Sequence, residues 1–399
     1  MISKQGLQSR LSGYFQRAAN QLIPNGYYDL GADKLPATSP RALIIYATHY
    51  LHKVLFKQAV DPAWVNSHSG FWESVELLRL VNEAGYIVDY FDTWNENLTI
   101  DWDRYDLVID ERDNLRHCTS VRPVKVFYCT GVYWLLQNVG ELRRNQAFME
   151  RTGIKTLVKR QMSPTTSDNH ADLISYFGSD AQLRCFTPRL GFVPLNISCV
   201  TVPASLVARD LVTTRNHFVW FGGAGLLHKG ADLAIEAFKE MPDVELHILG
   251  GIQEDDNLNE WLQVTARQYP NIRLEGWMNT ESPRFREIMA QSVAVLLPSA
   301  SEGGAGSAAQ AMHFGLLPIV TATANLRCPL GLVIDTEEPD AVIAGIQAAV
   351  RAVQARPAAE LARESAACMA FAKENFTREA YGRSIKALLA RVAEVRATR

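Results

Sequence analysis

Residues 296–320 read LLPSASEGGAGSAAQAMHFGLLPIV, and this stretch decides the fold. Apolar runs overlap its two ends, VAVLL at 293–297 and LPIV at 317–320, and both suit strands covered on both faces of a parallel sheet. Between them a loop carries Glu302, and a row of small residues leads into a helical segment that stops at Gly315. This order is typical of an open α/β sheet, in which ligands bind at the carboxyl ends of the strands.

The same alternation of strands and helices extends outward over most of the chain. HFVWFG at 217–222 and ALIIYA at 42–47 are buried-strand runs, and Phe71, Val75, Leu78 and Val81 recur at helical spacing. Further strands are expected at 86–91, 105–110, 125–129, 156–159, 171–177, 191–195, 244–248, 271–275 and 332–335, and further helices at 134–150, 229–241, 257–268, 281–291 and 305–314. Three helices follow Pro339. The pattern predicts an α/β protein with two doubly wound, Rossmann-like domains facing across a cleft.

A polar stretch at 204–216 divides the chain near its middle. We therefore predict an N-terminal extension (1–40), a first domain (41–205), a second domain (206–375) and a C-terminal helix (376–399) that could cross back to the first domain.

Composition excludes several classes of protein. In 399 residues, 40 Lys and Arg stand against 43 Asp and Glu, so the formal charge of −3 argues against a nucleic-acid partner. The sequence contains neither an apolar run of spanning length nor a signal-peptide core, which predicts a cytoplasmic protein. Six scattered cysteines form no CxxC pair and no Cys/His cluster, so we expect free thiols and no metal site.

The first glycine-rich loop, FGGAGLLHKG at 221–230, follows a strand and opens onto a helix. Gly222, Gly223 and Gly225 would let the backbone approach a ligand, and Lys229 adds a positive charge at a helix start that favours anions. The spacing matches neither GxGxxG nor the GxxxxGK[ST] phosphate loop. The alternative is a tight turn with a solvated lysine.

The second glycine-rich loop pairs Glu302 with small residues at 303–308. A carboxylate accepts hydrogen bonds from hydroxyls and repels phosphates, so Glu302 suits a sugar. The small residues would leave room and bare amides for it. The alternative is a loop with helix-capping glycines.

These two loops, with LHILGG at 246–251 and EGWMN at 275–279, resemble the donor half of retaining GT-B glycosyltransferases of family 4. SHSGFWESVELLRLVNEAGYIVDYFD at 67–92 is similar, more loosely, to the start of the acceptor domain. The resemblance implies that Lys229 contacts the diphosphate of a nucleotide-sugar and that Glu302 addresses the donor sugar, which makes these two the predicted catalytic residues. The other predicted donor-binding residues are Gly222, Gly223, Gly225, Trp277, Met278, Gly303, Gly304, Ala305, Gly306, Ser307 and Gln310.

Two positions depart from the family pattern. The second acid of its paired-glutamate motif falls on Gln310, and the basic residue that often precedes the lysine by five positions falls on Ala224. A neutral amide makes weaker hydrogen bonds to hydroxyls than a carboxylate does. Either the site is weaker, another Arg or Lys takes the missing role, or catalysis is lost.

Predicted acceptor-binding residues lie in the first domain. His68, Ser69 and Gly70 form a polar loop before a helix, and Thr130 and Gly131 follow the strand at 125–129. Ordinary turn chemistry is the alternative. Retaining chemistry, as the family implies it, needs no protein base. An inverting enzyme would need one, and His49, His68, Asp110 and His117 are the candidates.

The leading hypothesis is a glycosyltransferase that moves a sugar from a nucleotide-sugar to a glycan or lipid-linked acceptor in surface polysaccharide or glycoconjugate synthesis. Lys229 and oriented amides would stabilise the leaving diphosphate, and no DxD pair or metal cofactor is expected. A non-catalytic nucleotide-sugar-binding subunit is the second hypothesis. A dehydrogenase is disfavoured because GxGxxG is missing after the first strand.

Residues 141–161 carry six basic residues against two acidic ones, a net charge of +4. They could meet a phosphate-bearing lipid carrier or the inner face of an anionic membrane. The alternative is a solvated helix face.

Overall fold

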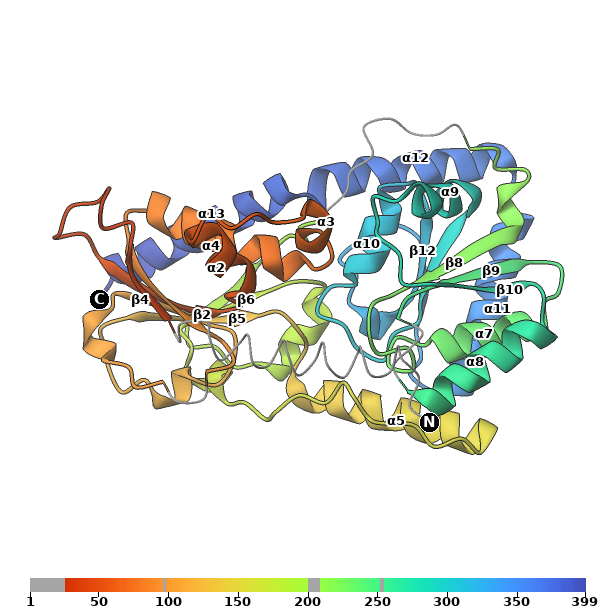
Figure 1. Cartoon of the computed structure of the whole chain (residues 1–399), viewed down its shortest axis with the longest axis horizontal. Helices are drawn as coiled ribbons and strands as arrows, with labels where there is room; N and C mark the ends of the chain where they lie inside the picture. The colour runs from red at the N-terminus through yellow and green to blue at the C-terminus, as the bar shows by residue number, and fades with distance from the viewer. Residues whose placement is uncertain (1–25, 96–97, 200–208, 252–254) are drawn as a thin grey trace.

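The computed structural model describes residues 26–95, 98–199, 209–251 and 255–399. Two α/β units lie side by side in it, each built on a mainly parallel sheet (Figure 1). The N-terminal residues 1–25 and part of the polar divider at 204–216 lie outside the described residues.

The first sheet has seven strands in the order β1-β3-β2-β4-β5-β6-β7. They are β1 (Gly26–Leu30), β2 (Arg41–Tyr46), β3 (Ile87–Asp92), β4 (Leu107–Asp110), β5 (Val124–Cys129), β6 (Leu173–Tyr176) and β7 (Gly191–Pro194). Helices α2 (His49–Leu55), α3 (Pro62–Val65), α4 (Ser69–Glu83) and α6 (Ser167–His170) accompany them. All pairings are parallel except that of β1, an antiparallel edge strand that the sequence did not predict.

The second sheet has six parallel strands in the order β10-β9-β8-β11-β12-β13. They are β8 (His217–Phe221), β9 (Glu245–Leu249), β10 (Ile272–Gly276), β11 (Ala294–Leu297), β12 (Leu317–Thr321) and β13 (Leu332–Ile334). Helices α7 (Ala231–Lys239), α8 (Asp256–Gln268), α9 (Pro283–Gln291), α10 (Gly306–Met312) and α11 (Pro339–Ala355) cover it. The predicted fold class, two parallel-sheet α/β units, is confirmed.

One predicted strand is wrong. TLVK at 156–159 forms neither strand nor helix, because its backbone groups bond to side chains and not to a neighbouring strand. The Leu157 N–H donates to Asp255 at 3.0 Å and the Lys159 N–H donates to Glu141 at 3.0 Å.

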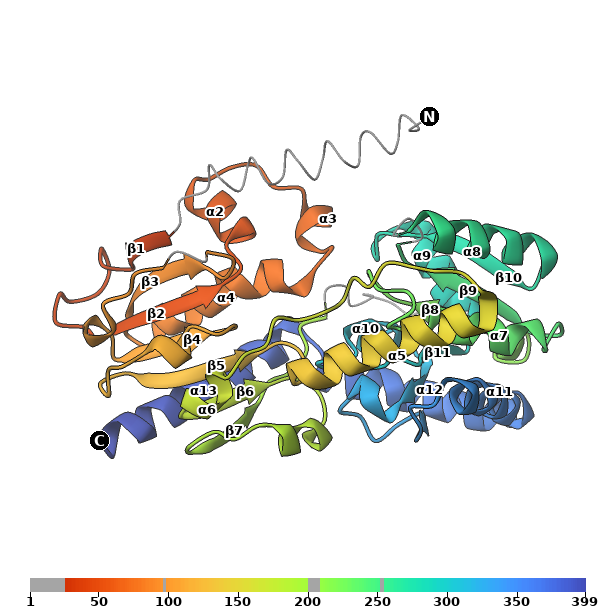
Figure 2. The same ribbon diagram turned by 90° about the horizontal axis from the view of Figure 1, so that it is seen from below.

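Helix α5 (Trp134–Thr152) leaves the first unit and packs along the second, as both ribbon views show (Figures 1 and 2). Phe148 is fully buried there, with its ring centroid 5.0 Å from that of Trp261. Arg144 donates to the carbonyl oxygen of Pro298 at 3.0 Å, and Arg151 pairs with Asp232. Arg144 and Arg151 therefore serve as contacts between the units, a role that the sequence analysis did not predict.

The chain crosses back through its last two helices, α12 (Ala358–Asn375) and α13 (Arg378–Ala397). Helix α13 packs on the first sheet, where the hydroxyls of Tyr381 and Tyr128 lie 2.9 Å apart and Ser384 accepts from the Asn196 N–H at 3.1 Å. All six cysteines are free. Among the described helices, none combines the length and the apolar character that crossing a bilayer requires.

Candidate active site

The carboxyl ends of β8, β9 and β10 meet at one edge of the second sheet. The Gly222 N–H donates to the carbonyl oxygen of Leu249 and the Gly250 N–H to that of Gly276, each at 3.0 Å. Gly223 lies on this edge in open space, and the neighbouring Trp277 side chain is 62% exposed. Met278 is partly buried, and its side chain packs against the apolar cluster on one face of the sheet.

The two predicted catalytic residues lie together. Lys229 Nζ forms an ion pair with Glu302, and the two side chains are only 11% and 13% exposed. The Ser299 hydroxyl donates to the same carboxylate at 3.0 Å. Burial raises the pKa of Glu302, but the positive charges of Lys229 and Arg160 outweigh it and hold that pKa below its ordinary value. The carboxylate is therefore charged at neutral pH, and each group neutralises the other.

Arg160 is a third charged group at this site, and sequence reasoning did not identify it. Its Nη1 donates to the carbonyl oxygen of Ala224 at 3.3 Å, and its Nε is buried without a hydrogen-bond partner. A Cβ on Gly225 would lie 2.0 Å from Arg160 Cδ, so the glycine is what lets this side chain in. The structure thus brings an arginine into contact with Ala224, the residue at which the family resemblance expects a basic side chain.

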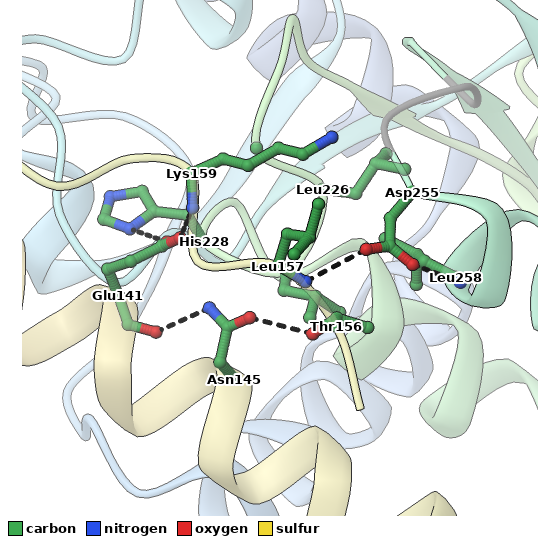
Figure 3. A pocket seen from close by; sticks show the side chains of 11 residues that line it. Glu141, Asn145, Thr156, Leu157, Lys159, Leu226, His228, Asp255 and Leu258 are labelled. Atoms are coloured by element: carbon green, nitrogen blue, oxygen red, sulfur yellow. Dashed lines mark hydrogen bonds and ion pairs between the residues drawn. The ribbon is translucent and has the colours of Figure 1, made fainter. Parts of the chain in front are cut away.

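A buried carboxylate on α5 fixes both glycine-rich loops (Figure 3). Glu141 accepts from the backbone N–H groups of Lys159 and Arg160, and its second oxygen lies 3.1 Å from His228 Nδ1. His228 Nε2 in turn lies 2.9 Å from the Ser301 carbonyl oxygen. Because His228 precedes Lys229 and Ser301 precedes Glu302, this chain of contacts sets the positions of the ion pair and of Arg160. No motif in the sequence pointed to it.

We expect Glu141→Gln to lower the free energy of unfolding at neutral pH by about 2 kcal/mol. The neutral amide accepts hydrogen bonds more weakly than the buried carboxylate that it replaces. Burial raises the pKa of Glu141, but the bonds from His228 and the two amides lower it below 4.5 overall. The carboxylate therefore stabilises the fold above that pH, and the contribution is lost as the pH falls below it. Urea unfolding should show a smaller difference in the free energy of unfolding between variant and wild type at pH 4 than at pH 7. Glu150→Gln, an exposed change on the same helix, is the control, and an equal effect in both variants would contradict this role.

The predicted sugar-binding glycines contact the first unit. A Cβ on Gly303 would lie 2.2 Å from the carbonyl oxygen of Thr130, and one on Gly304 would lie 3.1 Å from the Gly178 nitrogen. On the side where a Cβ would stand, each glycine is therefore packed against backbone of the first unit. Gly306 is exposed, and Ser307 is partly exposed.

Two further donor-site predictions fall on α10. Ala305, which caps this helix, is buried in a left-handed conformation with φ of 52°, which is rare for a residue with a side chain. Gln310 is buried within the helix.

The first unit presents its predicted residues at the same junction. His68 caps α4 and accepts from the Gly70 N–H at 3.1 Å, and Ser69 begins that helix. Burial, followed by the charges of Arg160 and Lys229, lowers the pKa of His68, so this loop faces the donor-side cations. Thr130 donates to Glu111 at 2.9 Å, and Gly131 lies beside Gly303.

His68 is also one of the four candidate bases for an inverting reaction, and the other three have different surroundings. Asp110 is fully buried and accepts from the Asn114 and Leu115 N–H groups, so its role is to hold a turn. His117 is exposed in a short 3-10 helix, and His49 begins α2 with its ring against Phe71.

Comparisons with known proteins agree with this geometry. Residues 215–352 match the family model described as glycosyl transferases group 1. The second unit belongs to the glycosyl transferases of group 1. The chain is also 35% identical over 102 residues to a glycogen synthase from Lactiplantibacillus plantarum, a match that covers 25% of this chain and 21% of that protein. The chain thus matches about a fifth of this relative's length.

Solved structures show that the group 1 glycosyl transferase unit and its partner have the GT-B fold. A sucrose-phosphate synthase from Thermosynechococcus elongatus superimposes with a TM-score of 0.58 at 14% identity, over 89% of this chain and 99% of that one. Anabaena HepE in complex with UDP and glucose superimposes with a TM-score of 0.53 at 11% identity, over 89% of this chain and 99% of that one. The predicted family resemblance is confirmed.

Proposed function

We propose that this protein transfers a glycosyl group from a nucleotide-sugar to an acceptor hydroxyl, with the donor on the group 1 unit and the acceptor on the first unit. The observation that carries the proposal is the cluster of Lys229, Glu302 and Arg160 at the junction of the two units. Two cations and one carboxylate suit a ligand with a diphosphate at one end and sugar hydroxyls at the other. Trp277 offers an exposed aromatic face for the base.

In this reaction the bond between the anomeric carbon and the diphosphate breaks while a bond to the acceptor oxygen forms. Negative charge grows on the departing phosphate, where Lys229 and Arg160 would stabilise it. The acceptor proton passes to a departing phosphate oxygen on the same face, so the anomeric configuration is retained. Glu302 would then hold donor hydroxyls and keep the Lys229 ammonium in place. A glycan or lipid-linked acceptor would enter beside His68 and Thr130.

A panel of nucleotides and nucleotide-sugars in a thermal-shift assay tests donor binding, because a ligand that prefers the folded state raises the unfolding midpoint. We expect one nucleotide-sugar to raise it well above the others and to be consumed when glycan acceptors are added. If no nucleotide-sugar of the panel shifts the midpoint, the proposal fails.

The amide at position 310 favours a second candidate, a nucleotide-sugar-binding subunit without turnover. Gln310→Glu distinguishes the two. If the protein is a transferase, the wild type should already consume the donor. If it is a subunit that lost activity through this residue, the wild type should bind the donor and leave it intact, and only the variant should turn it over.

A further inference from the structure

A cluster of imidazoles and carboxylates lies at the opposite edge of the second sheet, at the amino ends of its strands. His217 begins β8 and Glu245 begins β9, and the two are paired in register. His247 lies two residues after Glu245, so both side chains point to the same face of the sheet. Sequence spacing did not reveal the cluster because His217 comes from β8 and the other two residues come from β9.

We propose that His217, Glu245 and His247 bind a zinc ion. One donor atom from each residue lies within 4.8 Å of the others. His217 Nδ1 is 3.5 Å and His247 Nε2 is 3.8 Å from Glu245 Oε2. In a tetrahedral site with bonds of about 2.0–2.1 Å, ligand atoms lie roughly 3.4 Å apart, so small side-chain movements complete the geometry.

The surroundings orient both imidazoles for this role. His247 Nδ1 lies 2.9 Å from Glu275 Oε1, which places the proton on Nδ1 and leaves Nε2 free for a metal, as second-shell carboxylates do in zinc sites. His217 Nδ1 is buried and has no hydrogen-bond partner, an arrangement that costs free energy unless something binds it.

The cluster also opens to water. It lines a pocket of about 370 Å³ with Thr213, Thr214, Arg273, Arg284 and Gln291, so water can supply the fourth ligand. Two nitrogens and one carboxylate oxygen form a set that zinc prefers over calcium or magnesium, which select oxygen ligands.

Two arginines of this pocket oppose a cation, namely Arg284, which pairs with Glu275 at 2.7 Å, and Arg273. The Arg273 guanidinium donates to both oxygens of Glu245, at 2.9 and 3.0 Å. It fixes the carboxylate but adds a positive charge beside the metal. Removing it should therefore tighten zinc binding, a result that a purely structural ion-pair cluster would not give.

The test is a titration of the chelator-treated full chain with Zn²⁺ by calorimetry and with Co²⁺ by visible absorption. We expect one ion per chain, an intense four-coordinate Co²⁺ spectrum, and a raised unfolding midpoint with Zn²⁺. His217→Ala and His247→Ala should each weaken binding at least 100-fold, Glu275→Gln about 10-fold, and Arg273→Gln should strengthen it. His117→Ala, which removes an exposed histidine of the first unit, is the control.

The proposal is overturned if wild type binds no Co²⁺, or if the two histidine variants bind Zn²⁺ as the control does. The wild-type Co²⁺ spectrum decides the matter even where a variant fails to fold. Since the cluster lies at the edge opposite the glycine-rich loops, the nucleotide-induced thermal shift should be the same with and without zinc. The two proposals can therefore fail separately.

Discussion

Lys229→Met is expected to lower the turnover number by about 10²- to 10³-fold, the loss typical of removing one group that stabilises a leaving charge. The same change leaves the buried Glu302 carboxylate without its counter-charge, and breaking a buried pair in this way costs about 3–5 kcal/mol of stability. Turnover with the donor that gives the largest thermal shift, together with denaturant unfolding, measures both effects.

The double variant Lys229→Met/Glu302→Gln separates catalysis from folding. It removes both charges, so most of the lost stability should return while activity stays low. Lys239→Met, which removes the lysine of a partly exposed pair with Glu236 on α7, is the matched control and should be active. A double variant that recovers both stability and turnover would show that the pair is only structural.

Arg160→Gln is expected to raise the dissociation constant for the donor about 10- to 100-fold, since a hydrogen bond to a charged group contributes about 1.5–3 kcal/mol. The reason is the place of this side chain, which reaches the loop at Ala224 from the other unit and has a buried Nε without a partner. Calorimetric titration with the nucleoside diphosphate measures the change.

The chain offers a rescue and a control for this prediction. Ala224→Arg, in the Arg160→Gln background, restores a cation from the donor loop itself and should recover much of the affinity. Lys155→Gln removes the same charge from an exposed position on the same segment and should have little effect. Arg160 has no role in donor binding if its variant behaves like Lys155→Gln and the added arginine changes nothing.

The sheets could be predicted from sequence because buried parallel strands are continuous apolar runs, as ALIIYA and VAVLL show. The edge strand GYYDL at 26–30 has no such run, since it is covered on one side only and pairs antiparallel with β3. TLVK was misread because a short apolar run does not tell whether its amides bond to a strand or to side chains such as Glu141.

The residues of the site that stand in short sequence motifs could be predicted. Lys229 and Glu302 stand in loops whose glycines and flanking strands mark them in sequence. Arg160 and Glu141 could not be found in that way, because α5 alone brings them to the second unit. The packing of first-unit backbone against Gly303 and Gly304 could not be predicted either, because the sequence does not show which backbone lies against a glycine.

A crystal structure of the protein with UDP or GDP tests the central claim most directly. The account predicts that the diphosphate lies within hydrogen-bonding distance of Lys229 Nζ and the Arg160 guanidinium, with the base beside Trp277. A nucleotide bound away from both glycine-rich loops, at 222–230 and 299–306, would contradict it.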